Sequence, residues 1–370
     1  MALPPLDRTD GHHVLALPAD AVPSVVEILA RSRFPRAQWE AADPGTGPTP
    51  GSATASTTGT SGAGTPDAGT PGTAATPAGG GPRALRLSRH SRLLGPYGVD
   101  REIAADTGLP PGLAYLLEAP VERGNPPAPY GGDRLGLRRA FPAGLPVRDE
   151  ERVLLWALDA ARRLGGAVRI AERDGSPGAL LSPEPAAAID LTVWSDLWLD
   201  PDAALAVMRQ AVPRAQLNLP SGRWYGPPSD IGASPAPGAG ALTPEQRATL
   251  HAAADEFDRQ AMENPEPMTA YGALADLELD GMLALEISGE TTLPPVIAAL
   301  PWASRGAVAY RVRWEPADLE DAEQERPSPM HRVARGRAAP MVVAVARAVH
   351  GAVGGEVTDA MDFVVDPADL

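Results

Sequence analysis

The residues best suited to chemistry lie in a long loop, between residues 93 and 148, that combines many prolines and glycines with aromatic and charged side chains. Arginines bind anions through paired hydrogen bonds, and carboxylates can act as acids or bases. Loops of this length are usually functional or disordered, and this one has side chains that can pack. The candidate site residues are Glu122, Arg123, Asn125, Tyr130, Asp133, Arg134 and Arg138.

Two interpretations of this loop follow from its composition. In the first, Arg123, Arg134 and Arg138 bind an anionic ligand. In the second, the same arginines pair with acidic residues and hold the loop in one shape. We favour the second interpretation, because paired charges in a loop more often serve its structure.

A set of three carboxylates is the next candidate. Asp276, Glu278 and Asp280 alternate with Leu277 and Leu279, which predicts a strand with all three acids on one face, roughly 6.6–7 Å apart. Carboxylates at this separation could bind a divalent cation or serve acid–base catalysis. A solvated outer face of an amphipathic strand explains the pattern equally well, and we favour it.

One possible metal site and one aromatic pair complete the candidates outside the loop. His251, Asp255 and Asp258 lie on one stripe of a predicted helix, with the spacing of metal ligands. Nothing else in the sequence completes such a site, so we predict a solvated acidic face and no metal. Trp224–Tyr225 borders a proline-rich break and is a candidate for surface contact.

The one basic run favours a strand over a nucleic-acid site. Leu85 and Leu87 indicate a strand with arginines on its outer face, and four charges alone bind phosphate weakly at physiological salt. Nucleic acid is therefore an unlikely partner. The run consists of Arg83, Arg86, Arg89 and Arg92, with His90 beside them.

The absence of two residue types excludes whole classes of chemistry. The chain has no lysine and no cysteine, whereas arginine occurs 32 times. Without lysine there is no Schiff base and no phosphate-binding lysine, and without cysteine there is no thiolate nucleophile, disulfide or thiolate metal site. The sequence contains none of the common hydrolase, metalloprotease or P-loop motifs, so we expect no cofactor.

Charge and hydropathy indicate the broad class of the protein. Basic and acidic residues balance in residues 1–180, so the net charge of −15 falls in residues 181–370 and repels phosphate backbones. No stretch reaches the roughly 20 apolar residues that span a bilayer, and residues 1–10 do not resemble a secretory signal. We expect a cytoplasmic protein that does not contact membranes.

Three irregular stretches divide the chain. Residues 44–82 contain almost only small residues and proline, and we predict that they are disordered; residues 226–241 and 315–337 also indicate breaks. Between the breaks, strands and helices recur in the order of a split β-α-β, or ferredoxin-like, unit. We therefore predict an α+β protein of three tandem modules, with a single larger domain as the alternative.

The module boundaries follow from these breaks. Module 1 comprises residues 1–43 and 83–180 around the disordered insertion 44–82, module 2 comprises residues 181–281, and module 3 comprises residues 282–370. The best-marked elements are the helix that Thr243 and Gln246 begin as a capping box, the strand with alternating Leu283, Leu285 and Ile287, and the apolar helix 340–353.

Two functions are compatible with these features. The first is a non-catalytic protein whose tandem modules serve protein interaction or small-ligand regulation, with a protein or a small anion as partner. The second is a hydrolase or transferase that uses arginines and carboxylates of the loop 122–139, since such a site needs neither lysine nor cysteine. The sequence does not indicate an oligomeric state.

Overall fold

The computed structural model describes residues 2–3, 11–40, 83–173, 176–218, 243–263 and 268–370. The chain forms two compact units, Met1–Ala187 and Ala188–Leu370. Each unit is an α+β structure built on one antiparallel sheet, as the sequence predicts at this coarse level. Among the described helices, none combines the length and the apolar character that crossing a bilayer requires.

Unit 1 is built on a seven-stranded sheet with the order β2-β3-β4-β5-β1-β6-β7, in which all neighbouring strands are antiparallel. Strand β1, third from one edge and called the central strand of this unit below, pairs with β5 on one side and with β6 on the other, and it is buried along its whole length. The strands are β1 (His13–Leu17), β2 (Gln38–Trp39), β3 (Arg83–Arg86), β4 (Arg92–Val99), β5 (Gly112–Glu118), β6 (Ala167–Arg173) and β7 (Ser176–Leu181).

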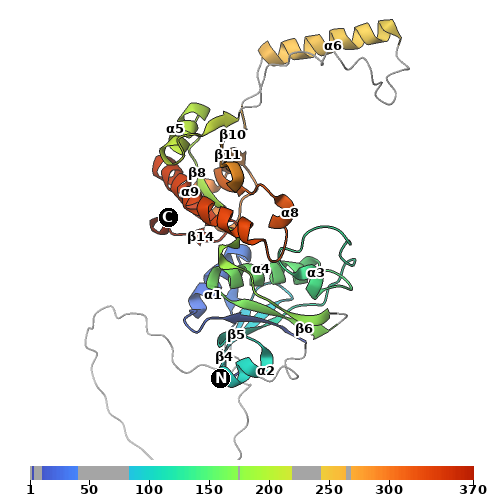
Figure 1. The fold of residues 1–370 in the computed structure, drawn as a ribbon, viewed down its shortest axis with the longest axis vertical. Helices are drawn as coiled ribbons and strands as arrows, with labels where there is room; N and C mark the ends of the chain where they lie inside the picture. The colour runs from blue at the N-terminus through green and yellow to red at the C-terminus, as the bar shows by residue number, and fades with distance from the viewer. Residues whose placement is uncertain (1, 4–10, 41–82, 174–175, 219–242, 264–267) are drawn as a thin grey trace, which may run out of the picture. The chain divides into compact units, whose positions relative to one another are not determined.

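Helices cover both faces of this sheet (Figure 1). On one face, α4 (Arg148–Leu164) packs against β1 and β6, and α1 (Pro23–Arg33) packs against α4. On the other face, α2 (Arg101–Thr107) covers a small apolar cluster around β4 and β5. The fourth helix, α3 (Leu137–Ala140), lies in the loop before α4. Because side chains alternate along β1, its residues contribute to the apolar layers on both faces of the sheet.

Unit 2 is built on a second seven-stranded sheet with the order β14-β13-β8-β12-β11-β10-β9, again antiparallel throughout. Strand β8, also third from one edge and called the central strand of unit 2, pairs with β12 and β13. The strands are β8 (Leu191–Ser195), β9 (Gln216–Asn218), β10 (Ala270–Asp276), β11 (Met282–Glu290), β12 (Ala307–Glu315), β13 (Glu356–Asp359) and β14 (Val364–Val365).

The long helix α9 (Pro329–Val353) packs on β8 and β12, and α5 (Pro201–Ala211) packs on α9, β9 and β10. The opposite face of the sheet carries α7 (Pro295–Ala298) over a small cluster around β8 and β12. The remaining helices are α6 (Pro244–Glu263), between β9 and β10, and α8 (Leu319–Ala322), before α9. The capping box predicted for α6 is present, because Thr243 and Gln246 exchange side-chain hydrogen bonds of 2.9 and 3.2 Å.

The two units share one topology. Reading the second sheet from its other edge gives β9-β10-β11-β12-β8-β13-β14, which matches β2-β3-β4-β5-β1-β6-β7 strand for strand. The helices match as well. The helices α1 and α5 directly follow β1 and β8, and the helices α4 and α9 directly precede β6 and β13. The chain therefore contains two copies of one α+β fold, which we call the internal repeat.

A repeated sequence supports this interpretation. Residues 35–38 and 213–216 both read Pro-Arg-Ala-Gln after the first helix of their unit. In each copy an arginine of that helix donates from Nε to the carbonyl oxygen of the alanine: Arg31 to Ala37 at 3.1 Å and Arg209 to Ala215 at 2.9 Å. The same bond at the same place shows that both segments adopt one local structure.

A glycine pair ends the long helix in both units. Gly165–Gly166 follows α4 and Gly354–Gly355 follows α9, with the first glycine of each pair in the left-handed region. A Cβ on the second glycine would collide with a carbonyl oxygen of the central strand. Both glycines are therefore needed for the chain to turn from the helix into the sheet.

The prediction of three ferredoxin-like modules does not describe this structure. Residues 181–281 and 282–370 share one sheet, since β10 pairs with β11 and β8 pairs with β12. Their apolar side chains also form a single core cluster, so neither segment buries its strands alone. The predicted insertion 44–82 and the break 226–241 lie outside the described residues.

Two segments that the sequence analysis treats as irregular contain regular elements. Residues 93–118 form most of β4, then α2 and β5, so the predicted loop begins only at residue 119. Residues 315–337 include α8 and the first turns of α9, which begins after the N-cap Ser328 and continues through Pro340. The sequence predicts an apolar helix over 340–353, so the predicted start lies about three turns after the observed one.

Two equivalent tyrosines show how the units differ in detail. Tyr115 faces Leu15 across β5 and β1, and Tyr310 faces Val193 across β12 and β8. The Tyr310 hydroxyl donates to the Leu197 carbonyl at 2.8 Å and accepts from the Leu199 amide at 2.9 Å. Burial raises the pKa of Tyr310, and the bond from Leu199 offsets part of this increase.

The Tyr115 side chain in unit 1 is fully buried, but among the described residues its hydroxyl has no hydrogen-bond partner. Burial alone raises the pKa of Tyr115 to about 12. The amide of Ala21, which corresponds to Leu199, instead bonds to the carbonyl of Pro18 at 3.1 Å. The tyrosine hydroxyl is therefore hydrogen-bonded in unit 2, whereas the equivalent hydroxyl in unit 1 has no such bond to the described residues.

We expect Tyr310→Phe to lower the free energy of unfolding of unit 2 by about 1–3 kcal/mol, because it removes two part-buried hydrogen bonds, to the Leu197 carbonyl and from the Leu199 amide. Tyr115→Phe should be neutral or stabilising, because it removes a buried hydroxyl that makes no bond. Urea unfolding of both variants checks this. An equal loss of stability in the two variants would contradict the comparison.

Candidate functional site

The loop 119–147 of unit 1 contains all seven candidate site residues, and a short backbone ladder closes it at its base. Gly124 donates to Leu145 at 2.8 Å, Leu145 donates to Asn125 at 3.1 Å, and Val147 donates to Glu122 at 3.0 Å. These bonds bring the two ends of the loop together and turn it into a closed excursion from the sheet. Asn125 takes part through its backbone carbonyl.

Below the base of the loop lies a buried carboxylate, that of Glu150 in the first turn of α4. It accepts from the backbone amide of Glu122 at 2.8 Å and forms an ion pair with Arg123. His13 of β1 lies at 3.2 Å on its other oxygen, and both side chains of this pair are fully buried. The Arg123 guanidinium also lies 4.7 Å from the ring centre of Phe141, so the loop is attached to the core by charge and by stacking.

The orientation of His13 follows from its second contact. The Nδ1 atom accepts from the amide of Ala171 in β6 at 3.1 Å, so in the neutral ring the proton is on Nε2, which donates to Glu150. This arrangement joins β1, β6, α4 and the loop through one polar network.

Two further contacts fix the start of α4. The Glu122 carboxylate accepts from the amide of Asp149 at 3.0 Å, next to the Arg148 residue with positive φ. The Asp149 carboxylate accepts from the hydroxyls of Ser88 and Ser91, both at 2.6 Å. Burial raises the pKa of Asp149, but these hydrogen bonds and the charge of Arg152 outweigh it and hold the pKa below its usual value.

The tip of the loop is organised around the Arg138 guanidinium. Its Nη1 donates to the carbonyls of Tyr130 at 2.9 Å and Gly132 at 3.2 Å, and its Nη2 donates to the carbonyl of Ala128. Gly131 has a φ of +109°, and a Cβ there would lie 2.9 Å from Arg138 Nη1. Glycine is therefore required for the arginine to approach the loop this closely.

The other polar side chains of the tip also serve the loop itself. The Asp133 carboxylate accepts from the amides of Arg138 at 2.9 Å and Arg139 at 3.1 Å, in the first turn of α3. Arg134 donates to the carbonyl of Ala187 at 2.9 Å. Tyr130, in contrast, is 87% exposed.

The seven candidate residues thus form two groups with different partners. Glu122 and Arg123 meet Glu150 at the base, and Asp133 and Arg138 organise the tip. Arg123 pairs with an acidic residue, as the favoured interpretation of the loop expects, whereas Arg134 and Arg138 bond to backbone carbonyls. Together these contacts hold the loop in one conformation and leave the Tyr130 side chain exposed to solvent.

Sequence reasoning missed His13 and Glu150. Glu150 precedes the buried Val153 and Leu154 by three and four positions, so it lies on the apolar stripe of α4, which was the available signal. Leu191 occupies the position of His13 in unit 2, and Ala339 occupies that of Glu150 when the glycine pairs are aligned. The fold itself does not need this polar network, which therefore belongs to the loop.

The other candidate sites are not assembled as sites. Only Asp276 is in a strand, because Glu278–Asp280 form a 3-10 turn with Glu278 at positive φ; the predicted strand face of three carboxylates is wrong. Leu277 is buried and Leu279 is 89% exposed, which reflects this turn.

The basic run lies on β3, on the turn after it and at the start of β4. Arg83, Arg86 and Arg89 are exposed, and Arg92 pairs with Glu118 at 2.7 Å. Arg83 also lies 5.2 Å from the ring centre of Trp39. This arrangement matches the solvated strand face that the sequence favours.

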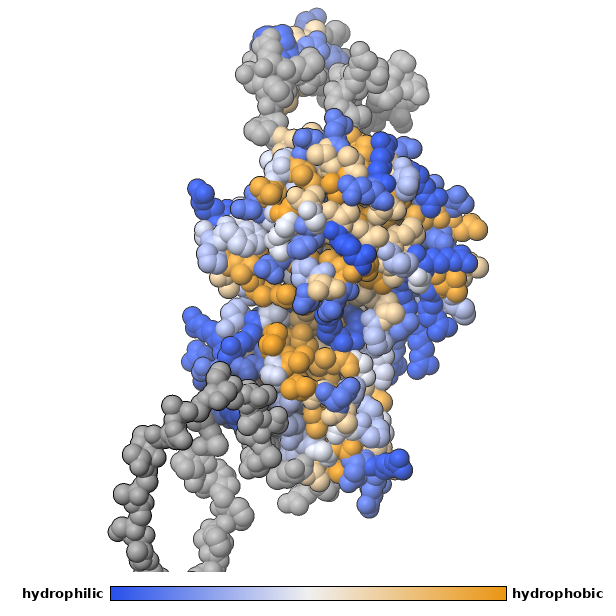
Figure 2. Space-filling model, turned by 90° about the vertical axis from the view of Figure 1, so that its left-hand side faces the viewer, coloured by the Kyte–Doolittle hydropathy of each residue, from blue (hydrophilic) through white to orange (hydrophobic). Residues whose placement is uncertain are grey.

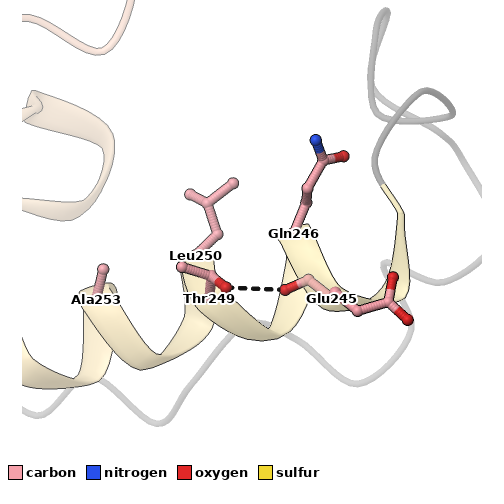
Figure 3. A pocket seen from close by; sticks show the side chains of 5 residues that line it. All are labelled: Glu245, Gln246, Thr249, Leu250 and Ala253. Atoms are coloured by element: carbon pink, nitrogen blue, oxygen red, sulfur yellow. Dashed lines mark hydrogen bonds between the residues drawn. The ribbon is translucent and has the colours of Figure 1, made fainter.

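His251 and Asp255 are exposed on α6, and the side chain of Asp258 lies outside the described residues, as does the pair Trp224–Tyr225. In the described part of the chain, no group of three or more potential ligands could hold a metal ion. A hollow on α6 is lined by side chains of this one helix, and Thr249 donates to the backbone of Glu245 beside it (Figure 3). A single helix provides no converging polar groups for a ligand.

Comparison with known proteins provides no relative: no protein-family model matches the chain, and neither a curated protein nor a solved structure matches it.

We expect Glu150→Ala to lower the free energy of unfolding of unit 1 by about 3–5 kcal/mol, because it removes the fully buried carboxylate that pairs with the part-buried Arg123. The matched control is Glu151→Ala, which removes an equal charge from the exposed side of the same helical turn and should change stability by less than about 0.5 kcal/mol. Denaturant unfolding measures both. Equal losses would show that Glu150 is not the anchor.

A second prediction concerns pH. Because the folded-state pKa of Asp149 is lowered, its contribution to stability is present above the unfolded pKa of about 4 and is lost as the pH falls through the folded value. The stability difference between the wild type and Asp149→Asn should therefore be largest above about pH 5 and shrink below it. Unfolding free energies measured from pH 3 to 7 check this, and a constant difference would contradict it.

Proposed function

We propose that this chain is a non-catalytic protein-interaction protein, in which the loop 119–147 presents residues 125–130 to an aromatic-lined groove of a partner protein. The observation that carries the proposal is the inward bonding of Arg138 to three loop carbonyls while Tyr130 is 87% exposed. The charged side chains Asp133 and Arg138 bond to the backbone of the loop itself, and the segment that ends in Tyr130 remains on the surface.

The sequence of this segment restricts its backbone. Residues 125–129 read Asn-Pro-Pro-Ala-Pro, so each of them is a proline or directly precedes one. Proline has a fixed φ, and residues before proline avoid the helical region, which favours polyproline II. Grooves lined by aromatic side chains recognise such segments because little backbone entropy is lost on binding.

The same contacts support interaction over the alternative of a hydrolase or transferase. The carboxylates of Glu122 and Asp133 accept from backbone amides, and Arg123 is paired with a buried carboxylate. Groups committed to these bonds serve the structure of the loop, whereas a catalytic base or anion clamp would have to be available to a substrate.

We expect the full-length protein to bind one or more members of a panel of purified SH3- and WW-type domains, which carry aromatic grooves for polyproline II segments. Tyr130→Ala should weaken that binding about 10-fold or more, since exposed aromatic anchors carry much of the energy of small interfaces. Gly131→Ala should weaken it as well, because it disturbs the Arg138 contacts without removing the tyrosine. Isothermal titration calorimetry measures both effects.

The matched control is Leu279→Ala, which removes a side chain that is 89% exposed in unit 2 and should leave binding unchanged. Failure of every domain in the panel to bind, or equal binding by Tyr130→Ala and the wild type, would overturn the proposal.

A further inference from the structure

The connection between β8 and α5 in unit 2 exposes two large apolar side chains on a fixed backbone. Leu197 is 53% exposed and Trp198 is 40% exposed. The backbone beneath them is held by the hydroxyls of Tyr310 and Tyr271, which bond to the carbonyls of Leu197 and Leu199. Ser195 adds a bond to the amide of Leu197 at 3.2 Å.

Trp198 is further supported by an edge-to-face contact with Tyr271, with 5.5 Å between ring centres. Its indole is therefore positioned before any partner binds. On the face that Figure 2 shows, apolar patches lie among hydrophilic residues.

The internal repeat shows that the fold does not need this pair. Residues 13–40 and 191–218 align without a gap, which places Ala19 and Asp20 where unit 2 has Leu197 and Trp198. Unit 1 forms the same central strand and first helix with these small or polar residues. The shared fold therefore does not require an exposed apolar pair at this position.

Acidic residues flank the pair in the sequence. Asp196, Asp200 and Asp202 are exposed, and Asp200 caps α5 through the amide of Ala203 at 2.9 Å. Among the ion pairs of the described residues, none involves Asp196 or Asp202. Residues 181–370 also carry the whole net charge of the chain, so the surroundings attract cations and repel phosphate.

We propose that Leu197 and Trp198 form a docking surface for a basic polypeptide segment, in which apolar side chains pack on the pair and flanking arginines or lysines meet Asp196 and Asp202. Charge selects this partner over two others. A second copy of the chain would bring the same acids face to face, and α6 carries the exposed acids Glu245, Asp255 and Glu256.

The test uses the full-length protein and two fluorescein-labelled synthetic peptides with the same leucine and tryptophan residues. One peptide carries arginine and the other glutamate at the flanking positions. Fluorescence anisotropy should show binding of the arginine peptide only. Trp198→Ala and Leu197→Ala should weaken it about 10-fold or more, and Asp196→Asn with Asp202→Asn should weaken it and flatten its salt dependence.

Leu319→Ala, which truncates another exposed apolar side chain of unit 2, is the control and should bind like the wild type. Equal binding of both peptides, no binding of either, or normal binding by Trp198→Ala would overturn the proposal.

Two other outcomes would identify a different occupant. Light scattering that finds a dimer lost in Trp198→Ala would identify a second copy. Faster tryptic cleavage at Arg247 and Arg259 of α6 in Trp198→Ala would identify that helix. Either result overturns the assignment to a basic partner.

Discussion

The burial of one long helix against the central strands of a seven-stranded sheet is the interaction on which each unit depends. In unit 1, α4 buries Val153, Trp156 and Ala157 completely, and in unit 2, α9 buries Val342, Val345 and Ala346 completely. The glycine pair at the end of each helix lets the chain enter the sheet directly beside the central strand. Every surface loop discussed above is attached to this helix–sheet core.

The internal repeat separates what the fold requires from what was added to it. Both copies keep the strand order, the Pro-Arg-Ala-Gln segment, the glycine pair and the buried tyrosine of β5 and β12. They differ in the network of His13, Arg123 and Glu150 and in the exposed apolar pair after β8. These differences coincide with the two surfaces to which we assign binding roles, one in each copy.

Local features of the fold were predictable from the sequence, and pairings between distant segments were not. Alternation predicted β11 and the capping box predicted the start of α6, because each signal lies within a few residues. The strand order depends on contacts between segments far apart in the chain. Three modules were predicted instead of two units because β8, β9 and β10 share a sheet with β11 to β14, which come later in the chain.

The predicted loop 93–148 contains regular elements up to residue 118, and the contacts of its candidate residues could not be predicted. Glu122 and Arg123 act through Glu150, and Glu150 acts through His13, which lies 137 positions away. The carboxylate row 276–280 failed for a local reason, since alternation with leucine is also compatible with a turn after a strand end. Period alone does not distinguish the two when the segment is this short.

In both units a long connection joins the two outermost strands at the corresponding edge of the sheet. Residues 40–82 lie between β2 and β3, and residues 219–269, including α6, lie between β9 and β10, which is the same position in both copies. The cost of closing a longer connection grows only slowly with its length, so such an edge tolerates added chain. A fluorescent protein or an affinity tag could thus be grafted there in either half, leaving the central helix and strands undisturbed.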